Sequence, residues 1–168
     1  QIIVVNGVSK AYAMTGWRIG YVAAPEALAK AIGKIQSQST SNPCAPAQWA
    51  SVEAIENGDK DIPSMKTAFN ERREYIAEAL NKIEGIQCTT PDGAFYVFPN
   101  ISGLYGKTYQ GKPISNSVEF CASLLDAKGV ACVPGAGFGA DNYIRLSYAT
   151  DLETIKDGVT RISSFVNT

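Results

Sequence analysis

The sequence predicts an α/β fold in two parts, with an α+β arrangement in the second part. Short runs rich in β-branched and aromatic residues alternate with segments whose apolar residues recur every three or four positions. A polar stretch with Gly58 and Pro63 separates residues 1–60 from residues 61–168. A helical pattern of about 20 residues follows directly, and a helix of that length, about 30 Å, can join two lobes.

The first part is expected to contain two strands and two helices. Pro25 suits the first position of a helix, and Gly58 suits the end of one. The elements expected in chain order are a strand buried on both faces (2–5), a turn (14–17), a second strand (18–23), a helix opened by Pro25, a loop (37–46) and a helix from Pro46 to Gly58.

The second part is expected to alternate helices and strands. Asn116 with Glu119, and Thr150 with Glu153, match the capping box that opens a helix. The elements expected in chain order are a long helix ended by Gly85, a strand (94–98), an exposed excursion (104–113), a helix (116–128) ended by Gly129, a strand (130–133), a loop (134–137), a strand (143–149) and a last helix that reaches Val166.

Composition excludes several classes of function. The net charge of -1 gives no electrostatic attraction for nucleic acid or an anionic membrane surface. No apolar run approaches the roughly 20 residues needed to span a bilayer. The opening Gln1-Ile2-Ile3 lacks the features of a signal peptide. We therefore expect a cytoplasmic protein with neither nucleic acid nor membrane as a partner.

The cysteine and histidine content argues against metal and triad chemistry. The chain contains no histidine, and its cysteines form no CxxC motif, so we expect no metal site. Mechanisms that pair serine or cysteine with histidine are likewise excluded within this chain. Four reduced and mostly buried thiols are expected: Cys44, Cys88, Cys121 and Cys132.

Lys10 ends an apolar run and precedes a glycine-rich turn that contains Arg18. A lysine held at the mouth of a buried strand loses solvation, its pKa falls, and its neutral amine can condense with an aldehyde. Arg18 follows eight residues later in an apolar setting, where a buried guanidinium needs an anionic partner. Either an internal carboxylate or a ligand phosphate satisfies that need. A lysine imine beside a phosphate clamp is the arrangement that pyridoxal phosphate requires.

Arg145 poses the same question on the expected strand at 143–149. Ile144, Leu146 and Tyr148 share one face of this strand, so Arg145 lies on the opposite face. Its guanidinium fork matches a carboxylate through two parallel hydrogen bonds. That carboxylate belongs either to a salt bridge on an exposed sheet face or to a substrate.

Three segments taken together resemble the class I pyridoxal-phosphate-dependent aminotransferases of fold type I, in the family's order. They are residues 9–21 with Lys10 and Arg18, residues 93–96, and residues 143–149 with Arg145. The resemblance spans essentially the whole chain. Residues 6–10, 37–41 and 47–50 look most like the bacterial aspartate aminotransferase branch, which also includes prephenate aminotransferases.

The resemblance implies a role for each of these residues. Lys10 would hold pyridoxal 5'-phosphate as a covalent imine and would be the general acid and base of the proton shift. Arg18 would bind the cofactor phosphate, and Arg145 would bind the substrate α-carboxylate. Many relatives have a serine three residues before the lysine that also contacts the phosphate. Gly7 stands there in this chain, so that contact is expected to be absent.

Three neighbouring side chains are given smaller roles. Ser9 is a weak substitute for the missing serine, because its side chain is expected to point to the opposite face from Lys10. Phe95 and Tyr96 are expected to line the substrate side of the pocket without a catalytic role.

The resemblance further implies that the chain is the C-terminal part of a longer enzyme. Residues 1–60 would end the cofactor-binding large domain, and residues 61–168 would form the long connecting helix and the small domain. The family's other cofactor contacts lie upstream of Lys10, so the isolated chain is expected to be inactive. The full-length protein would be a homodimer that transfers the amino group of L-aspartate to 2-oxoglutarate.

Several alternatives remain open at the level of the sequence. The same fold and cofactor would serve an aromatic, alanine or prephenate aminotransferase, since substrate choice depends largely on upstream residues. A cofactor-sensing regulator would join an aminotransferase-like domain to a DNA-binding segment. A free-standing interaction module would need a partner for its exposed strands.

Overall fold

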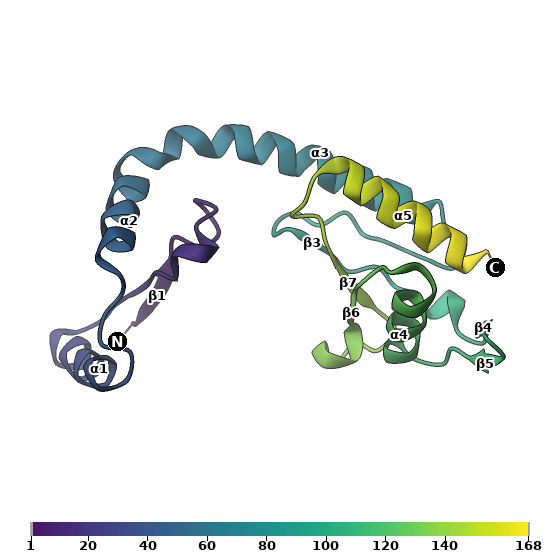
Figure 1. Cartoon of the computed structure of the whole chain (residues 1–168), viewed down its shortest axis with the longest axis horizontal. Coiled ribbons are helices and arrows are strands. Elements are labelled where there is room, and N and C mark those ends of the chain that lie inside the picture. Colours follow the sequence, from purple (N-terminus) through teal and green to yellow (C-terminus); the bar gives the residue numbers. More distant parts are fainter. Residues whose placement is uncertain (1, 168) are drawn as a thin grey trace. The chain divides into compact units, whose positions relative to one another are not determined.

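The computed structural model describes residues 2–167 and forms two compact units that divide between Lys66 and Thr67 (Figure 1). Helices and short antiparallel strands occur in both units, which confirms the expected α/β class. The placement of a large-domain end at residues 1–60 and a small domain at residues 61–168 stays a prediction.

The first unit is built on a β-hairpin followed by helices. Its elements are β1 (Val4–Gly7), the 3₁₀ turn η1 (Thr15–Trp17), β2 (Gly20–Ala23), α1 (Glu26–Ser39), α2 (Ala45–Asn57), the 3₁₀ turn η2 (Gly58–Asp61) and the start of α3 (Ile62–Asn81). Strands β1 and β2 pair antiparallel from Val4 opposite Ala23 to Gly7 opposite Gly20. A small apolar cluster fills the unit: Val8, Met14, Ile19 and Ala47.

The expectation of a strand buried on both faces at residues 2–5 is wrong. The strand begins at Val4, and its apolar side chains are exposed, Val5 by 77%. Within residues 2–167, β1 pairs with β2 alone, so the ladder covers one edge and neither face. Helix α1 is likewise open to solvent, because none of its residues is buried.

The expected second strand also begins later than predicted, because of Arg18. Its φ of 57° puts Arg18 in the left-handed region, where it ends the turn η1. A residue in that conformation cannot continue an extended strand, so β2 starts at Gly20. Helix α1 runs on to Ser39 across part of the expected loop, and α2 ends at Asn57 as Gly58 predicted.

The polar stretch at residues 57–63, which is expected to be a boundary, is helical throughout. Turn η2 follows α2 directly, and α3 begins at Ile62 with Pro63 in its first turn. Proline is tolerated there because the first N–H groups of a helix have no partner within it. Helix α3 is 20 residues long, as its apolar spacing predicted, and ends at Asn81 rather than at Gly85.

The second unit places helices against a small antiparallel sheet with strand order β3-β7-β6 (Figure 1). After α3 its elements are β3 (Tyr96–Val97), η3 (Ser102–Leu104), β4 (Thr108–Tyr109), β5 (Lys112–Pro113), α4 (Ser117–Lys128), β6 (Val133–Pro134), η4 (Gly135–Phe138), β7 (Ile144–Ser147) and α5 (Leu152–Val166). The expected strands at 94–98, 130–133 and 143–149 are therefore shorter or shifted. Ala94 is left-handed, which delays β3.

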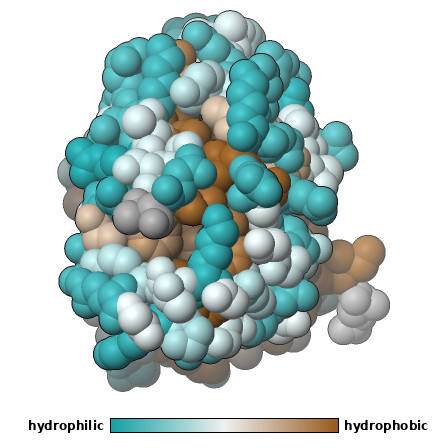
Figure 2. Space-filling model, turned by 90° about the vertical axis from the view of Figure 1, so that its right-hand side faces the viewer, coloured by the Kyte–Doolittle hydropathy of each residue, from teal (hydrophilic) through white to brown (hydrophobic). Residues whose placement is uncertain are grey.

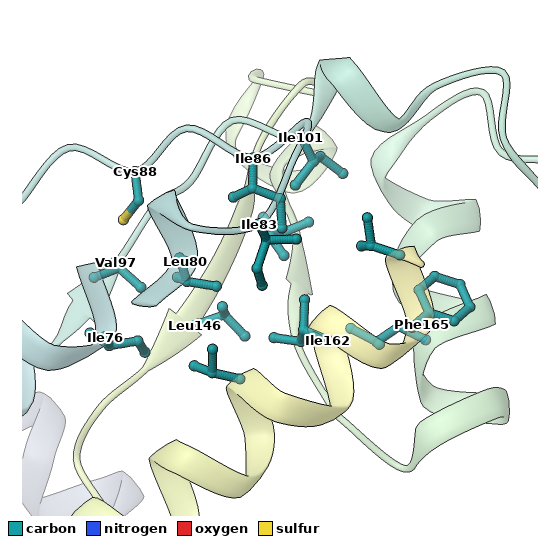
Figure 3. Packing of buried hydrophobic residues seen from close by; sticks show 14 of the residues in the cluster. Ile76, Leu80, Ile83, Ile86, Cys88, Val97, Ile101, Leu146, Ile162 and Phe165 are labelled. Carbon is teal, nitrogen blue, oxygen red and sulfur yellow. The ribbon is translucent and has the colours of Figure 1, made fainter. Parts of the chain in front are cut away.

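The core of the second unit joins α3, α5 and β7. Figure 3 shows their apolar side chains pointing toward one another. Residues of this core include Ile76, Leu80, Ile83, Ile86, Cys88, Val97, Ile101, Leu146, Ile162 and Phe165. Each fully buried aliphatic side chain contributes about 1.5–3 kcal/mol through removal of its surface from water. The three-to-four spacing of apolar residues in α3 and α5 thus reports a buried face in each helix.

Two helix starts test the expected capping boxes. Asn116 caps α4, since its Oδ1 accepts from Glu119 N at 2.9 Å, which confirms the first. The second is off by one residue. Asp151, not Thr150, caps α5, and its Oδ1 accepts from Thr154 N at 2.8 Å. The hydrogen bond from the Thr154 hydroxyl, followed by this bond from the Thr154 backbone, lowers the pKa of the Asp151 carboxyl.

Gly135 fixes the turn that leads from β6 into η4. Its N donates to Tyr143 O at 2.8 Å, and its carbonyl accepts from Ala140 N at 3.0 Å. A Cβ at this position would collide with Ala140 O and Tyr143 O, which are backbone atoms that cannot rotate away. The turn can therefore close only around a glycine.

We expect Gly135→Ala to lower the free energy of unfolding by about 2–3 kcal/mol, because the added carbon overpacks a backbone contact. Urea unfolding followed by circular dichroism measures the change. Gly137→Ala is the matched control, since a Cβ there meets no atom within 4 Å. Equal stability of the two variants would contradict the conclusion that this turn closes only around a glycine.

Candidate active site

Lys10 lies in the loop that joins β1 to β2 in the first unit. The loop is fixed on both sides of it: Ala13 N donates to Lys10 O at 3.3 Å, and Thr15 Oγ1 donates to Ser9 O at 3.1 Å. Val8, two residues earlier, is buried and anchors the loop in the apolar cluster. The Lys10 side chain itself is exposed, so its amine can be reached from outside this unit.

Gly7 explains why no serine side chain stands three residues before Lys10. It pairs with Gly20 in the β1–β2 ladder, and a Cβ at Gly7 would lie 2.9 Å from Ile19 O. The two strands approach too closely here for any side chain. Position 7 therefore offers no side chain to a phosphate.

Arg18 is exposed, so the expectation of a buried guanidinium in an apolar setting is wrong. The cause is the left-handed turn, which directs Ile19 into the core in its place. One nitrogen, Nη1, donates to Thr15 O at 3.0 Å and holds the side chain against its own turn. Arg18 also lines a hollow of about 480 Å³, together with Gly16, Trp17, Pro43, Cys44, Pro46 and Ala47.

The hollow next to Arg18 is suited to an anion. It lies at the start of α2, where backbone N–H groups lack partners within the helix and the helix dipole is positive. A guanidinium and a helix start together favour a phosphate. Lys10 is not among the residues that line this hollow.

Tyr12 connects the Lys10 loop to the end of α2. Its hydroxyl donates to Asp59 Oδ1 at 3.1 Å, and a Cβ at Gly58 would touch its ring at 3.0 Å. Desolvation, followed by the hydrogen bond to the Asp59 carboxylate, raises the pKa of Tyr12. The phenol therefore remains a donor at neutral pH and keeps the loop tied to η2.

Arg145 lies in the second unit, in the middle of β7. Ile144, Leu146 and Tyr148 are buried, and Arg145 lies half-buried on the opposite face, which confirms the expected alternation. Its guanidinium carbon lies 4.3 Å from the centre of the Tyr96 ring and 5.0 Å from that of Phe138. Aromatic rings at these distances attract a cation and restrict its motion.

A chain of ring contacts supports this arrangement. Phe138 meets Phe98 edge to face at 5.9 Å, and Phe98 stacks on Tyr143 at 5.0 Å with an interplanar angle of 10°. No sequence pattern identifies Phe138, because it belongs to the glycine-rich loop and not to any periodic element. Tyr96 is expected to line the pocket, and the structure adds its contact with Arg145.

Ser117 holds the Phe138 turn against α4. It is fully buried, its Oγ donates to Asp141 Oδ1 at 2.7 Å, and the same Oγ accepts from Ala136 N at 3.1 Å. Its backbone N also donates to Asp141 Oδ1, at 3.0 Å. One buried hydroxyl thus joins the start of α4, turn η4 and the chain that leads into β7.

The ion pairs of residues 2–167 do not include Arg145. Within these residues Arg145 therefore does not form the alternative, a salt bridge on an exposed sheet face. The N–H groups of Arg145 are available for a carboxylate supplied from outside the described residues. A guanidinium of this kind binds a carboxylate in a bidentate manner.

Other parts of the described chain offer weaker candidates for a functional site. Residues 2–167 contain no group of three metal-ligating side chains and no helix long and apolar enough to cross a bilayer. A hollow of about 720 Å³ lies between the β4–β5 hairpin and the end of α5, on the side seen in Figure 2, where apolar residues show between polar ones. None of the three sequence-predicted residues lines it.

Comparison with known proteins gives relatives over nearly the whole chain. The chain is 48% identical over 161 residues to an aspartate/prephenate aminotransferase of Cereibacter sphaeroides, covering 95% of this chain and 40% of that protein. The crystal structure of the aspartate aminotransferase from Rhizobium meliloti matches with a TM-score of 0.93 and 43% identity, over 98% of this chain and 42% of that one. An aromatic aminotransferase structure from Pyrococcus horikoshii matches with a TM-score of 0.86 and 34% identity, over 98% of this chain and 43% of that one.

This chain spans about 40% of the length of these relatives. The family model described as aminotransferase class I and II matches residues 1–162, which include Lys10, Arg18 and Arg145. That family uses pyridoxal phosphate. This chain, which carries Lys10, Arg18 and Arg145, is therefore a member of the class I and II aminotransferase family.

Proposed function

We propose that this chain supplies the lysine and two arginines of a pyridoxal-phosphate-dependent transaminase that passes the amino group of L-aspartate to 2-oxoglutarate. The observation that carries the proposal is the guanidinium of Arg145. It is held against two aromatic rings and has no carboxylate in ion-pair contact within residues 2–167. An α-carboxylate, common to amino-acid and 2-oxo-acid substrates, fits such a fork.

The residues of the first unit would hold the cofactor. Arg18 and the start of α2 would bind its phosphate, and the Lys10 amine would hold its aldehyde group. When bound, the cofactor would supply an electron sink for cleavage of the substrate Cα–H bond. Lys10 Nζ would accept and return the Cα proton, and Arg145 would orient the substrate for that transfer.

The two parts of the chain take different places in this proposal. Residues 1–60 end a cofactor-binding large domain, and residues 61–168 form the connecting helix and the small domain. The exposed apolar side chains of β1 and α1 favour the idea that further protein covers them. The complete protein works as a cytoplasmic homodimer, with amino acids and 2-oxo acids as its substrates.

A second candidate is transamination of an aromatic substrate or prephenate. The names of the Cereibacter sphaeroides and Pyrococcus horikoshii relatives support it, and so do the rings of Tyr96, Phe98 and Phe138 next to Arg145. The full-length protein, purified and assayed with aspartate, phenylalanine and prephenate as alternative substrates, separates the two through the ratio of kcat/KM values.

We expect this 168-residue chain alone to give no measurable transamination, and a chimera to be active. In the chimera this chain replaces the matching part of the Rhizobium meliloti aspartate aminotransferase, which supplies the remaining cofactor contacts. Within it, Lys10→Ala is expected to abolish both the imine absorbance and turnover, because no other amine can hold the aldehyde.

The matched control is Lys30→Ala, which removes an exposed lysine from the helix pair with Glu26. This variant is expected to keep its spectrum and rate, since an exposed pair of this kind contributes little. An unchanged spectrum in Lys10→Ala would remove Lys10 from its role. Turnover by the isolated chain would contradict its dependence on further protein.

We expect Arg145→Lys in the same chimera to lower kcat/KM for aspartate by about 100-fold, because an ammonium cannot make two parallel hydrogen bonds to a carboxylate. Steady-state kinetics measures the loss. Arg161→Lys, in the exposed pair with Asp157 on α5, is the matched control and should retain the original rate. A loss in both variants, or in neither, would refute the carboxylate role of Arg145.

A further inference from the structure

Two cysteines of the second unit lie with their sulfur atoms in contact. Cys121 is on α4, and Cys132 directly precedes β6. Their Sγ atoms are 3.2 Å apart, with Cys132 donating to Cys121. Cys121 is buried and Cys132 is partly buried. Nothing in the proposed transamination uses either thiol.

The fold brings this pair together from both sides. Gly129, with φ of 67°, ends α4 in the left-handed conformation and turns the chain back. Helix α4 then packs against β6, which sets Cys132 opposite the first turns of the helix. A disulfide has a sulfur–sulfur distance of about 2.05 Å, so the two atoms need to approach by only about 1 Å.

The hydrogen bond makes the two sulfur atoms unequal. Donation from Cys132 stabilises a thiolate at Cys121 and lowers the pKa of the Cys121 thiol. The same bond, together with burial, raises the pKa of Cys132, which keeps its proton. A thiolate is the nucleophile in thiol oxidation, so we expect Cys121, the acceptor of the hydrogen bond, to react first.

We propose that Cys121 and Cys132 form a redox modification site that hydrogen peroxide closes to a disulfide. The Cys121 thiolate attacks one peroxide oxygen, the O–O bond breaks, and hydroxide leaves as water after protonation. Cys132 sulfur then attacks the sulfenic sulfur of Cys121. The S–O bond breaks, and the oxygen leaves with the Cys132 proton as a second water. The two thiols lose two electrons in all, and peroxide is reduced to two waters.

A small oxidant suits this site better than a bulky disulfide. Cys121 is only 7% exposed, which disfavours the approach of a bulky disulfide. The other two cysteines lack such a partner among the described residues. Cys44 is exposed in the first unit, and burial raises the pKa of the Cys88 thiol to about 11.

The disulfide would act on the strand beside Arg145. Val133, the residue after Cys132, pairs with Arg145 in the β6–β7 ladder. A covalent bond from α4 to this point restrains β6 in the native state and restricts the unfolded chain. Oxidation therefore stabilises the part of the sheet that carries Arg145, and we expect a higher melting temperature for the oxidised form.

Tryptic mapping tests the proposal on the folded 168-residue chain. The chain is treated with hydrogen peroxide, remaining thiols are alkylated, and the protein is digested without reductant. Lys128 lies between the two cysteines, so the disulfide links the peptide 108–128 to the peptide 129–145. We expect this linked pair at a mass about 2 Da below the sum of the peptides, and its loss after reduction.

Controls separate this site from general oxidation. A Cys44→Ser background prevents links through the exposed thiol, and in it Cys121→Ser and Cys132→Ser should each abolish the linked pair. The yield should fall about tenfold in concentrated urea, where the fold no longer holds the sulfurs together. Three results would overturn the proposal. They are recovery of Cys121 and Cys132 as free, alkylated thiols after peroxide treatment, sulfinic acid on either cysteine, and an equal yield of the linked peptides in urea.

Discussion

The contact of the Arg145 guanidinium with two aromatic rings depends on almost everything else in the second unit. Strand β7 must bury Ile144, Leu146 and Tyr148 against α3 and α5, and its pleat then turns Arg145 to the other face. Strand β3 supplies one ring and turn η4 the other. A cation so placed is restrained before any carboxylate arrives, which lowers the ordering cost of binding.

The glycine-rich turn is the least replaceable part of this support. Gly135 admits two backbone carbonyl oxygens where a side chain would begin, and buried Ser117 joins the turn to α4 through Asp141 and Ala136. The cysteine pair lies on the same connection between α4 and β6, so a change in the oxidation state of those thiols reaches the strand next to Arg145.

The helices of this chain were more predictable than its strands. Periodic apolar residues located α3 and α5, and Asn116 and Gly129 located both ends of α4, because each signal acts within a few residues of chain. The strands are two to four residues long, and their ends depend on pairing with distant residues. Arg18 and Ala94 show why the predicted strand starts were misplaced: each adopts a left-handed conformation, which neither arginine nor alanine favours by residue type.

The sequence by itself determined the family resemblance, the choice of Lys10, Arg18 and Arg145 as the residues proposed for the site, and the face of β7 on which Arg145 lies. These follow from residue type, order and alternation along one strand. Only the tertiary structure decided that Arg18 is exposed beside the start of α2, that Phe138 and Tyr96 contact Arg145, and that Cys121 meets Cys132. Those contacts join residues from separate elements, and their geometry is set by packing, which no local pattern encodes.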